Sequence, residues 1–146
     1  MFPSSNVRDI TQKPALAIYY DNSTSSSAAG ADGLITINTT EKLDGFTLSS
    51  SVITCLVPGC YEVNFNMSAY MSAGAAGVTY GYRKNGGTSQ WSIASTSTLV
   101  VPCAVTFGIY LAYRDTLEFR QIGGDVATTA TTYYPKVVVK QISTFQ

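Results

Sequence analysis

Hydrophobic and polar residues alternate along much of this chain, with a period of two. The clearest alternation follows a Pro-Gly turn at residues 58 and 59. The series there is Tyr61, Glu62, Val63, Asn64, Phe65, Asn66, Met67 and Ser68. Such alternation places one face of a strand in a core and the other in water. Nowhere do apolar residues recur at the spacing of a helix over eleven or more residues, so we predict strands throughout.

The pattern predicts nine strands, over residues 14–20, 34–38, 46–55, 60–71, 78–83, 89–93, 99–113, 116–122 and 133–142. We expect 46–55 and 60–71 to form a hairpin about the Pro-Gly turn. A second hairpin is expected about Asn85-Gly86, because Asn-Gly is a strong signal for a tight turn. Strand 99–113 is the longest of the nine. Small and polar residues predict loops at 21–33, 72–77 and 123–132.

Short strands at this spacing predict an all-β fold, a jelly-roll β-sandwich of two antiparallel sheets with about eight to ten strands. The chain has 146 residues, which suits one domain. We expect residues 14–146 to form that domain. Residues 1–13 are polar and are predicted to be an N-terminal arm or attachment segment.

Composition limits the partners. Hydrophobic residues make up 45% of the chain, enough for a core, but charged residues make up only 12%, about half the usual share of roughly 25%. The net charge of zero argues against nucleic acid and anionic membrane surfaces, which require a concentrated positive field. No apolar run approaches the ~20 residues of a membrane helix. A neutral surface does little to keep copies apart, so we expect part of it to be covered.

Three cysteines and no histidine limit the chemistry. The odd count excludes a fully paired framework. Cys55 and Cys60 flank the Pro-Gly turn and are interpreted as free thiols, with a disulfide between them left open. The ligand set does not suit zinc. Without histidine, Ser-His and Cys-His catalysis is absent, and Glu62 and Glu118 have the surroundings of solvated faces rather than of a glycosidase pair. We predict no enzyme activity.

The segment around the Pro-Gly turn also resembles a family signature. The pattern Phe-x-Cys-x-Val-Pro-Gly-x-Tyr-x-Phe-x-Tyr marks the globular head of complement C1q and its relatives in the tumour necrosis factor superfamily. In this chain the matching residues are Cys55, Val57, Pro58, Gly59 and Tyr61. Apolar residues fill the other core positions of the pattern, at Ile53, Val63 and Phe65.

Two later segments extend the resemblance. Residues 83–86 resemble the family's Lys-Asn-rich hairpin, and Asp115 matches the aspartate of its Gly-Asp-x-Val-x-Leu strand start. The family's closing Phe-Ser-Gly-x-Leu segment is absent, and Tyr134-Pro135-Lys136-Val137-Val138-Val139 stands in its place. Order and spacing agree over residues 14–142.

The resemblance implies a homotrimer, in which the first, third, sixth and last strands form an inner sheet that faces the threefold axis. Candidate residues of the core or trimer interface are Tyr61, Val63, Phe65, Phe107, Ile109 and Val137. Relatives often hold Ca²⁺ near the trimer apex through loop carboxylates. Because Ca²⁺ takes six to eight oxygens and no dense acidic loop is present, we predict no cofactor, with Ca²⁺ as the alternative.

We therefore predict a non-enzymatic trimeric recognition head, on the surface of a virion, at a viral or phage fibre, spike or vertex. It would bind a host-surface glycan or protein receptor, since loops rich in Ser, Thr, Asn, Gly and Tyr suit adaptable hydrogen bonding. Candidate ligand residues on the loops are Asn22, Asp32, Lys84, Asn85 and Asp125. Two alternatives are a cellular C1q-like module, secreted or on the cell surface, and a structural capsid or coat subunit without a ligand.

Overall fold

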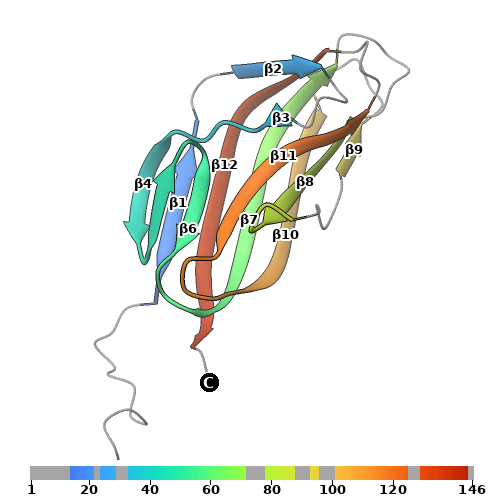
Figure 1. The fold of residues 1–146 in the computed structure, drawn as a ribbon. Coiled ribbons are helices and arrows are strands. Elements are labelled where there is room, and N and C mark those ends of the chain that lie inside the picture. Colours follow the sequence, from blue (N-terminus) through green and yellow to red (C-terminus); the bar gives the residue numbers. More distant parts are fainter. Residues whose placement is uncertain are drawn as a thin grey trace, which may run out of the picture.

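A computed structural model shows two six-stranded sheets packed face to face (Figure 1). It describes residues 14–21, 24–28, 33–71, 78–87, 93–95, 101–124 and 129–144, and no helix occurs among them. The strands are β1 (Leu16–Tyr20), β2 (Thr24–Ala28), β3 (Gly33–Leu34), β4 (Thr39–Asp44), β5 (Phe46–Ser49), β6 (Val52–Cys55), β7 (Gly59–Met71), β8 (Val78–Lys84), β9 (Ile93–Ser95), β10 (Val101–Leu111), β11 (Thr116–Gly124) and β12 (Thr129–Thr144). Without the very short β3 and β9 there are ten.

The first sheet has the strand order β10-β7-β12-β1-β4, and β2 pairs with β12. The second sheet has the order β5-β6-β11-β8-β9, and β3 pairs with β11. All of these pairings are antiparallel. The chain passes from one sheet to the other between β6 and β7 and again between β10 and β11, as in a jelly roll. The predicted all-β jelly-roll sandwich is confirmed.

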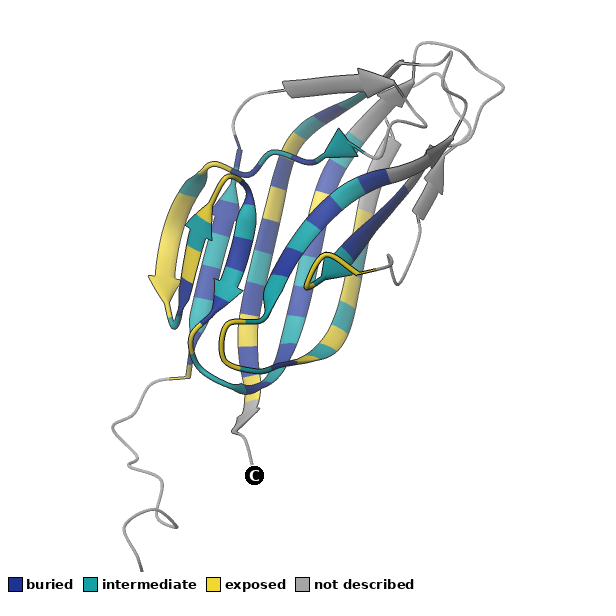
Figure 2. Cartoon of the chain, in the orientation of Figure 1, coloured by how far each residue is buried: buried dark blue, intermediate teal, exposed yellow. Residues whose placement is uncertain are grey.

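The core lies between the sheets and uses the period-two pattern. Along β1, β7 and β12, buried residues alternate with more exposed ones (Figure 2). Aromatic rings join the two sheets: Phe65 of β7 stacks on Phe119 of β11, with centroids 4.6 Å apart. Tyr82 of β8 stacks on Phe107 of β10 at 4.4 Å. Offset stacking of this kind adds to the free energy gained from burial.

The Pro-Gly turn does not close a hairpin, and this prediction is wrong. The strand before it, β6, pairs with β5 and β11 in the second sheet, whereas the strand after it, β7, pairs with β10 and β12 in the first. Residues 56–58 therefore connect the two sheets. Residues 46–55 are not one strand either. They form the β5–β6 hairpin, which turns at Ser50 and Ser51 with φ of 49° and 64°.

Three further differences concern the first half of the chain. The predicted loop 21–33 contains β2, whose backbone pairs with the beginning of β12. The predicted strand 34–38 is largely irregular, although Ile35 and Ile37 are buried. The charged strand β4 was not predicted. It lies at the edge of the first sheet, where all but its first residue are exposed, so it has no alternating pattern to detect.

In the second half, the longest strand among the described residues is β12, with 16 residues, and not the predicted 99–113, which is the 11-residue β10. Six residues of the predicted loop 123–132 belong to strands, two to the end of β11 and four to the beginning of β12. The pairing of β12 with β7 is interrupted between Tyr133 and Lys136, where Tyr134 has a φ of 49°. This β-bulge accommodates Pro135, which has no N–H for the ladder. Strand β9 covers residue 93 of the predicted return strand.

Candidate functional site

The candidate loops lie at two opposite ends of the sandwich. We define the distal end by Ala28, Met71, Val78, Gly124 and Thr129, the strand residues that border residues 29–32, 72–77 and 125–128 in the sequence. The register pairs Met71 with Ala130, Val78 with Gly124, and Ala28 with Thr129. The described strand ends that border residues 29–32, 72–77 and 125–128 are thus neighbours (Figure 1). Of the candidate ligand residues, Asn22, Asp32 and Asp125 lie outside the described residues.

The other two candidates, Lys84 and Asn85, lie at the opposite or proximal end. We define this end by Pro14, Gly45, residues 84–87, residues 112–115 and Thr144. Lys84 ends β8, six residues after Val78, which is roughly 20 Å along a strand. The sequence could not separate the two groups, because loop composition does not say at which end of a sandwich a loop lies.

Lys84 and Asn85 hold two turns together. Asn85 and Gly86 have φ of 54° and 69°, and Gly87 N–H donates to the Lys84 carbonyl at 2.9 Å, so the predicted Asn-Gly turn is confirmed. The Asn85 amide donates to Asp115 Oδ1 at 2.9 Å and accepts from Thr116 N–H at 2.8 Å. Lys84 Nζ lies 3.3 Å from Asp115 Oδ2. The geometry of both side chains is that of a structural connection.

Asp115 is the centre of this connection. Burial alone would raise the pKa of its carboxyl, but the Ala112 N–H, the Asn85 amide and the Lys84 ammonium lower that pKa below its ordinary value. The Ala112 N–H donates to Asp115 Oδ2 at 2.8 Å. Lys84 also donates to the Tyr110 carbonyl at 2.9 Å. The carboxylate therefore ties the end of β8 to the turn between β10 and β11.

The candidate core or interface residues point into the sandwich. Tyr61, Val63, Phe65 and Val137 are fully buried within the single chain. Phe107 and Ile109 are partly buried and pack against the same cluster. Because side chains alternate along a strand, the opposite face of the first sheet carries the intervening residues, and its role in assembly stays a prediction.

That opposite face of the first sheet is polar at its centre. A groove of about 350 Å³ there is lined by Glu62, Asn64, Asn66, Lys136, Val138 and Lys140. Asn64 donates to Thr106 Oγ1 on β10 at 3.1 Å, and Asn66 donates to Asn64. The register sets Glu62 opposite Lys140. This part of the sheet is polar on its outward side, because the aliphatic side of β7 and β12 faces the core.

The signature residues hold the connection between the sheets. Tyr61 O–H donates to the Val57 carbonyl, and Cys55 Sγ donates to the same carbonyl at 3.1 Å. Burial is the main cause that raises the pKa of the Cys55 thiol and of the Tyr61 phenol. Cys55 is buried at the end of β6, whereas Cys60 is half-buried on the face of β7 opposite to Tyr61. Both are free thiols. A raised pKa makes the Cys55 thiol a poor nucleophile.

Other chemistry finds little support in the described part of the chain. Glu62 lies on the first sheet and Glu118 on the second, and Glu118 accepts from Arg120 at 2.9 Å, so the structure does not bring the two carboxylates together. Within the described residues, no three acidic or cysteine side chains are placed to hold a metal ion. No described helix is long and apolar enough to cross a membrane.

The fold is similar to the jelly rolls of complement C1q and tumour necrosis factor, as the resemblance of the signature predicted. The globular domain of zebrafish complement 1qA protein is similar over 91% of this chain and 100% of that one, with a TM-score of 0.65 and 16% identity. The tumour necrosis factor Eiger from S. frugiperda matches over 92% and 96%, with a TM-score of 0.63 and 11% identity. Murine APRIL matches over 88% and 99%, with a TM-score of 0.53 and 10% identity.

No family model matches this sequence, and no curated protein does. The likeness at 10–16% identity therefore concerns the three-dimensional arrangement of the strands.

Proposed function

We propose that this chain is a non-enzymatic, trimeric binding module that presents its distal end to a ligand. The fold supports the proposal, since the structures it resembles include a complement globular domain and a tumour necrosis factor. The described strands support the choice of the end that would face the ligand. Strands β7, β8, β11 and β12 reach the distal end, and the predicted ligand loops are attached there.

The observation that carries the proposal is the position of the two chain ends. The beginning of β1 and the end of β12 both lie at the proximal end (Figure 1). Ala15 N–H donates to Gln141 Oε1 at 3.0 Å, and Gln141 N–H donates to the Ala15 carbonyl at 2.9 Å. This buried pair fixes the entry of the chain beside β12. Attachment through residues 1–13 would therefore leave the distal end free.

The module would serve as an attachment head on a virion, at the tip of a fibre or spike or at a vertex, where it would bind a host-surface glycan or protein. The low content of charged residues supports a surface that binds by hydrogen bonds and aromatic contacts. Jelly rolls recur in capsid and lectin domains. No cofactor is needed for such binding.

Two measurements test this proposal. Light scattering coupled to size exclusion should give the mass of three copies, and labelled protein should bind on a glycan array or to host cells. Asp32→Ala and Asp125→Ala in the distal loops should reduce that binding, whereas Glu41→Gln, on the exposed strand β4, should not. A lone subunit at every concentration would contradict the trimer. A trimer whose binding ignores both loop substitutions would favour the coat subunit.

A further inference from the structure

An apolar pocket lies on the outward face of the first sheet, at its β4 edge and near the proximal end. Its volume is about 270 Å³. The pocket is lined by Pro14, Ala15, Leu16, Lys42, Asp44 and Lys140. Leu16 pairs with Asp44 on one side and with Lys140 on the other, so the pocket spans three neighbouring strands. Its charged groups stand around an aliphatic floor.

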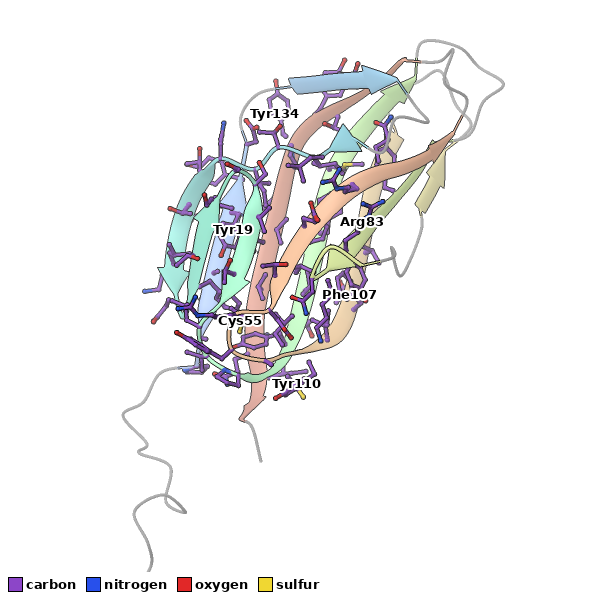
Figure 3. All side chains as sticks on the ribbon, in the orientation of Figure 1. Tyr19, Cys55, Arg83, Phe107, Tyr110 and Tyr134 are labelled. Atoms are coloured by element: carbon purple, nitrogen blue, oxygen red, sulfur yellow. The ribbon has the colours of Figure 1, made fainter. Side chains whose placement is uncertain are left out.

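A large aromatic side chain lies at the other edge of the same sheet. Tyr110 of β10 is 42% exposed and is found at the proximal end (Figure 3). It follows the exposed positions Ala104, Thr106 and Gly108, which alternate with half-buried ones, so its ring is on the outward face. The Lys84 ammonium lies 5.8 Å from the centre of the ring, and Lys84 also binds the Tyr110 carbonyl. The ring is held at the sheet edge by these contacts.

The pocket and the ring lie at the same height along the strands. One row across the first sheet contains Gly108, Glu62, Lys140, Leu16 and Asp44. Tyr110 lies two residues from Gly108 toward the proximal end, and Pro14 lies two residues from Leu16 in the same direction. The two features are therefore separated across the sheet, by roughly 19 Å for four strand spacings, and hardly along it.

We infer that Tyr110 of one copy inserts into the pocket beside Leu16 of the next copy. This inference rests on the proposed trimer and names the contact that builds it. A contact between two different patches forms a closed ring only when the repeated rotation returns to its start without a rise. Patches at equal height on opposite edges of one face meet this condition, because the axis can run parallel to the strands.

The chemistry of the two patches is complementary. A whole aromatic side chain buries roughly 150–250 Å², and because Tyr110 is 42% exposed, its insertion would remove a little under half of that area from water. The Asp44 carboxylate at the pocket rim can accept a hydrogen bond from the Tyr110 hydroxyl, or face the Lys84 ammonium that accompanies the ring. A second copy of the chain is thus a better occupant than a free apolar ligand, which would leave Asp44 without these partners.

The test compares Tyr110→Ala with Leu56→Ser in analytical ultracentrifugation over a wide concentration range. Leu56 is 40% exposed, nearly as much as Tyr110, but it lies in the connection between the sheets. Tyr110→Ala should raise the concentration at which the trimer dissociates by roughly 30-fold or more, as the loss of a buried aromatic anchor does. Leu56→Ser should leave it unchanged, and both variants should keep the strand signal in circular dichroism.

Mixing gives a second readout. Leu16→Arg should block the pocket and leave Tyr110 intact. Tyr110→Ala alone and Leu16→Arg alone should each be monomeric at concentrations where the wild type is trimeric. A mixture of Tyr110→Ala and Leu16→Arg should form one-to-one pairs, because one complete contact is then available. If the Tyr110→Ala variant remains as trimeric as the wild type, or if the two variants do not pair on mixing, this contact is wrong while the proposed trimer still stands. A monomeric wild type would instead contradict the trimer itself.

Discussion

At the scale of single residues, the signature is explained by the connection between the sheets. The Val57 carbonyl accepts hydrogen bonds from the Tyr61 hydroxyl and from the Cys55 thiol. Gly59 is buried at the beginning of β7. These residues fix the angle at which the chain leaves β6 and enters β7. Their role is structural. Cys55 and Tyr61 occur in one signature because both donate to the same carbonyl oxygen.

Asp115 gives a prediction at the same scale. Asp115→Asn should lower the free energy of unfolding at pH 7 by about 1–2 kcal/mol, because charge-assisted hydrogen bonds from Ala112, Asn85 and Lys84 are weakened. The pKa of the Asp115 carboxyl is lower in the folded chain than its ordinary value of 3.8. The unfolded chain therefore binds the proton more readily. This part of the stability is complete above pH 3.8 and is lost as the pH falls below it.

Urea unfolding at pH 7 and at pH 3 checks this prediction. The difference between wild type and Asp115→Asn should be large at pH 7 and should shrink at pH 3. Glu41→Gln is the control, because Glu41 makes an exposed pair with Lys136 at 4.0 Å, and such pairs contribute little. An equal loss for both variants at pH 7 would contradict the role assigned to Asp115.

At the scale of strands, the pattern succeeded where one face of a strand is buried. Strands β1, β7 and β11 were predicted with bounds within a few residues, because their alternation records burial on a single face. Strands β2 and β4 were missed because backbone pairing forms them with little or no apolar alternation. The Pro-Gly turn was assigned to a hairpin because sequence shows that the chain turns, but not which sheet the next strand joins.

The corner between β4 and β5 gives a prediction at this scale. Gly45 has a φ of +84°, and a Cβ there would lie 2.8 Å from Ala15 Cβ and 3.1 Å from Val57 Cγ2. Gly45→Ala should therefore combine backbone strain of about 1–2 kcal/mol with a steric clash. Gly86 has a φ of +69° and nothing within 4 Å of such a Cβ. Gly86→Ala should show the backbone strain alone.

Thermal and urea unfolding of the two variants separates these terms. Gly45→Ala should be clearly less stable than Gly86→Ala, and the difference measures the tightness of the corner where the N-terminal strand meets the connection between the sheets. Equal losses would mean that Ala15 and Val57 move away at little cost. The corner would then not hold the beginning of β1 in place.

At the scale of the whole molecule, the position of the ligand loops could be predicted only in part. The sequence predicted Lys84 and Asn85 as loop residues. Asn85 lies in the turn, whereas Lys84 is the last residue of β8, and the fold places both at the proximal end in contact with Asp115. Loop composition does not show at which end of the sandwich a loop lies, because that position depends on long-range strand pairing. The polar outward face of β7 was predicted from its alternation, but its place in an assembly could not be predicted. Alternation shows that two faces differ, but not which one meets another copy.

That polar face gives the last prediction. Within one chain, Glu62 lines the same groove as Lys136 and Lys140. In a trimer with the first sheet toward the axis, the three grooves would face one another. Glu62→Lys would add a third ammonium group to this groove in every copy, directly opposite Lys140. Like charges opposite each other on a sheet are destabilising, and three copies would bring these charges together.

The Glu62→Lys trimer should dissociate at low salt and reassemble when added salt shortens the Debye length to a few ångströms. Glu62→Gln, which removes the pairing without adding repulsion, should stay trimeric in both conditions. Sedimentation at 20 mM and 1 M salt, roughly the two extremes of screening, measures the difference. A Glu62→Lys trimer that is stable at low salt would show that this face points away from the axis.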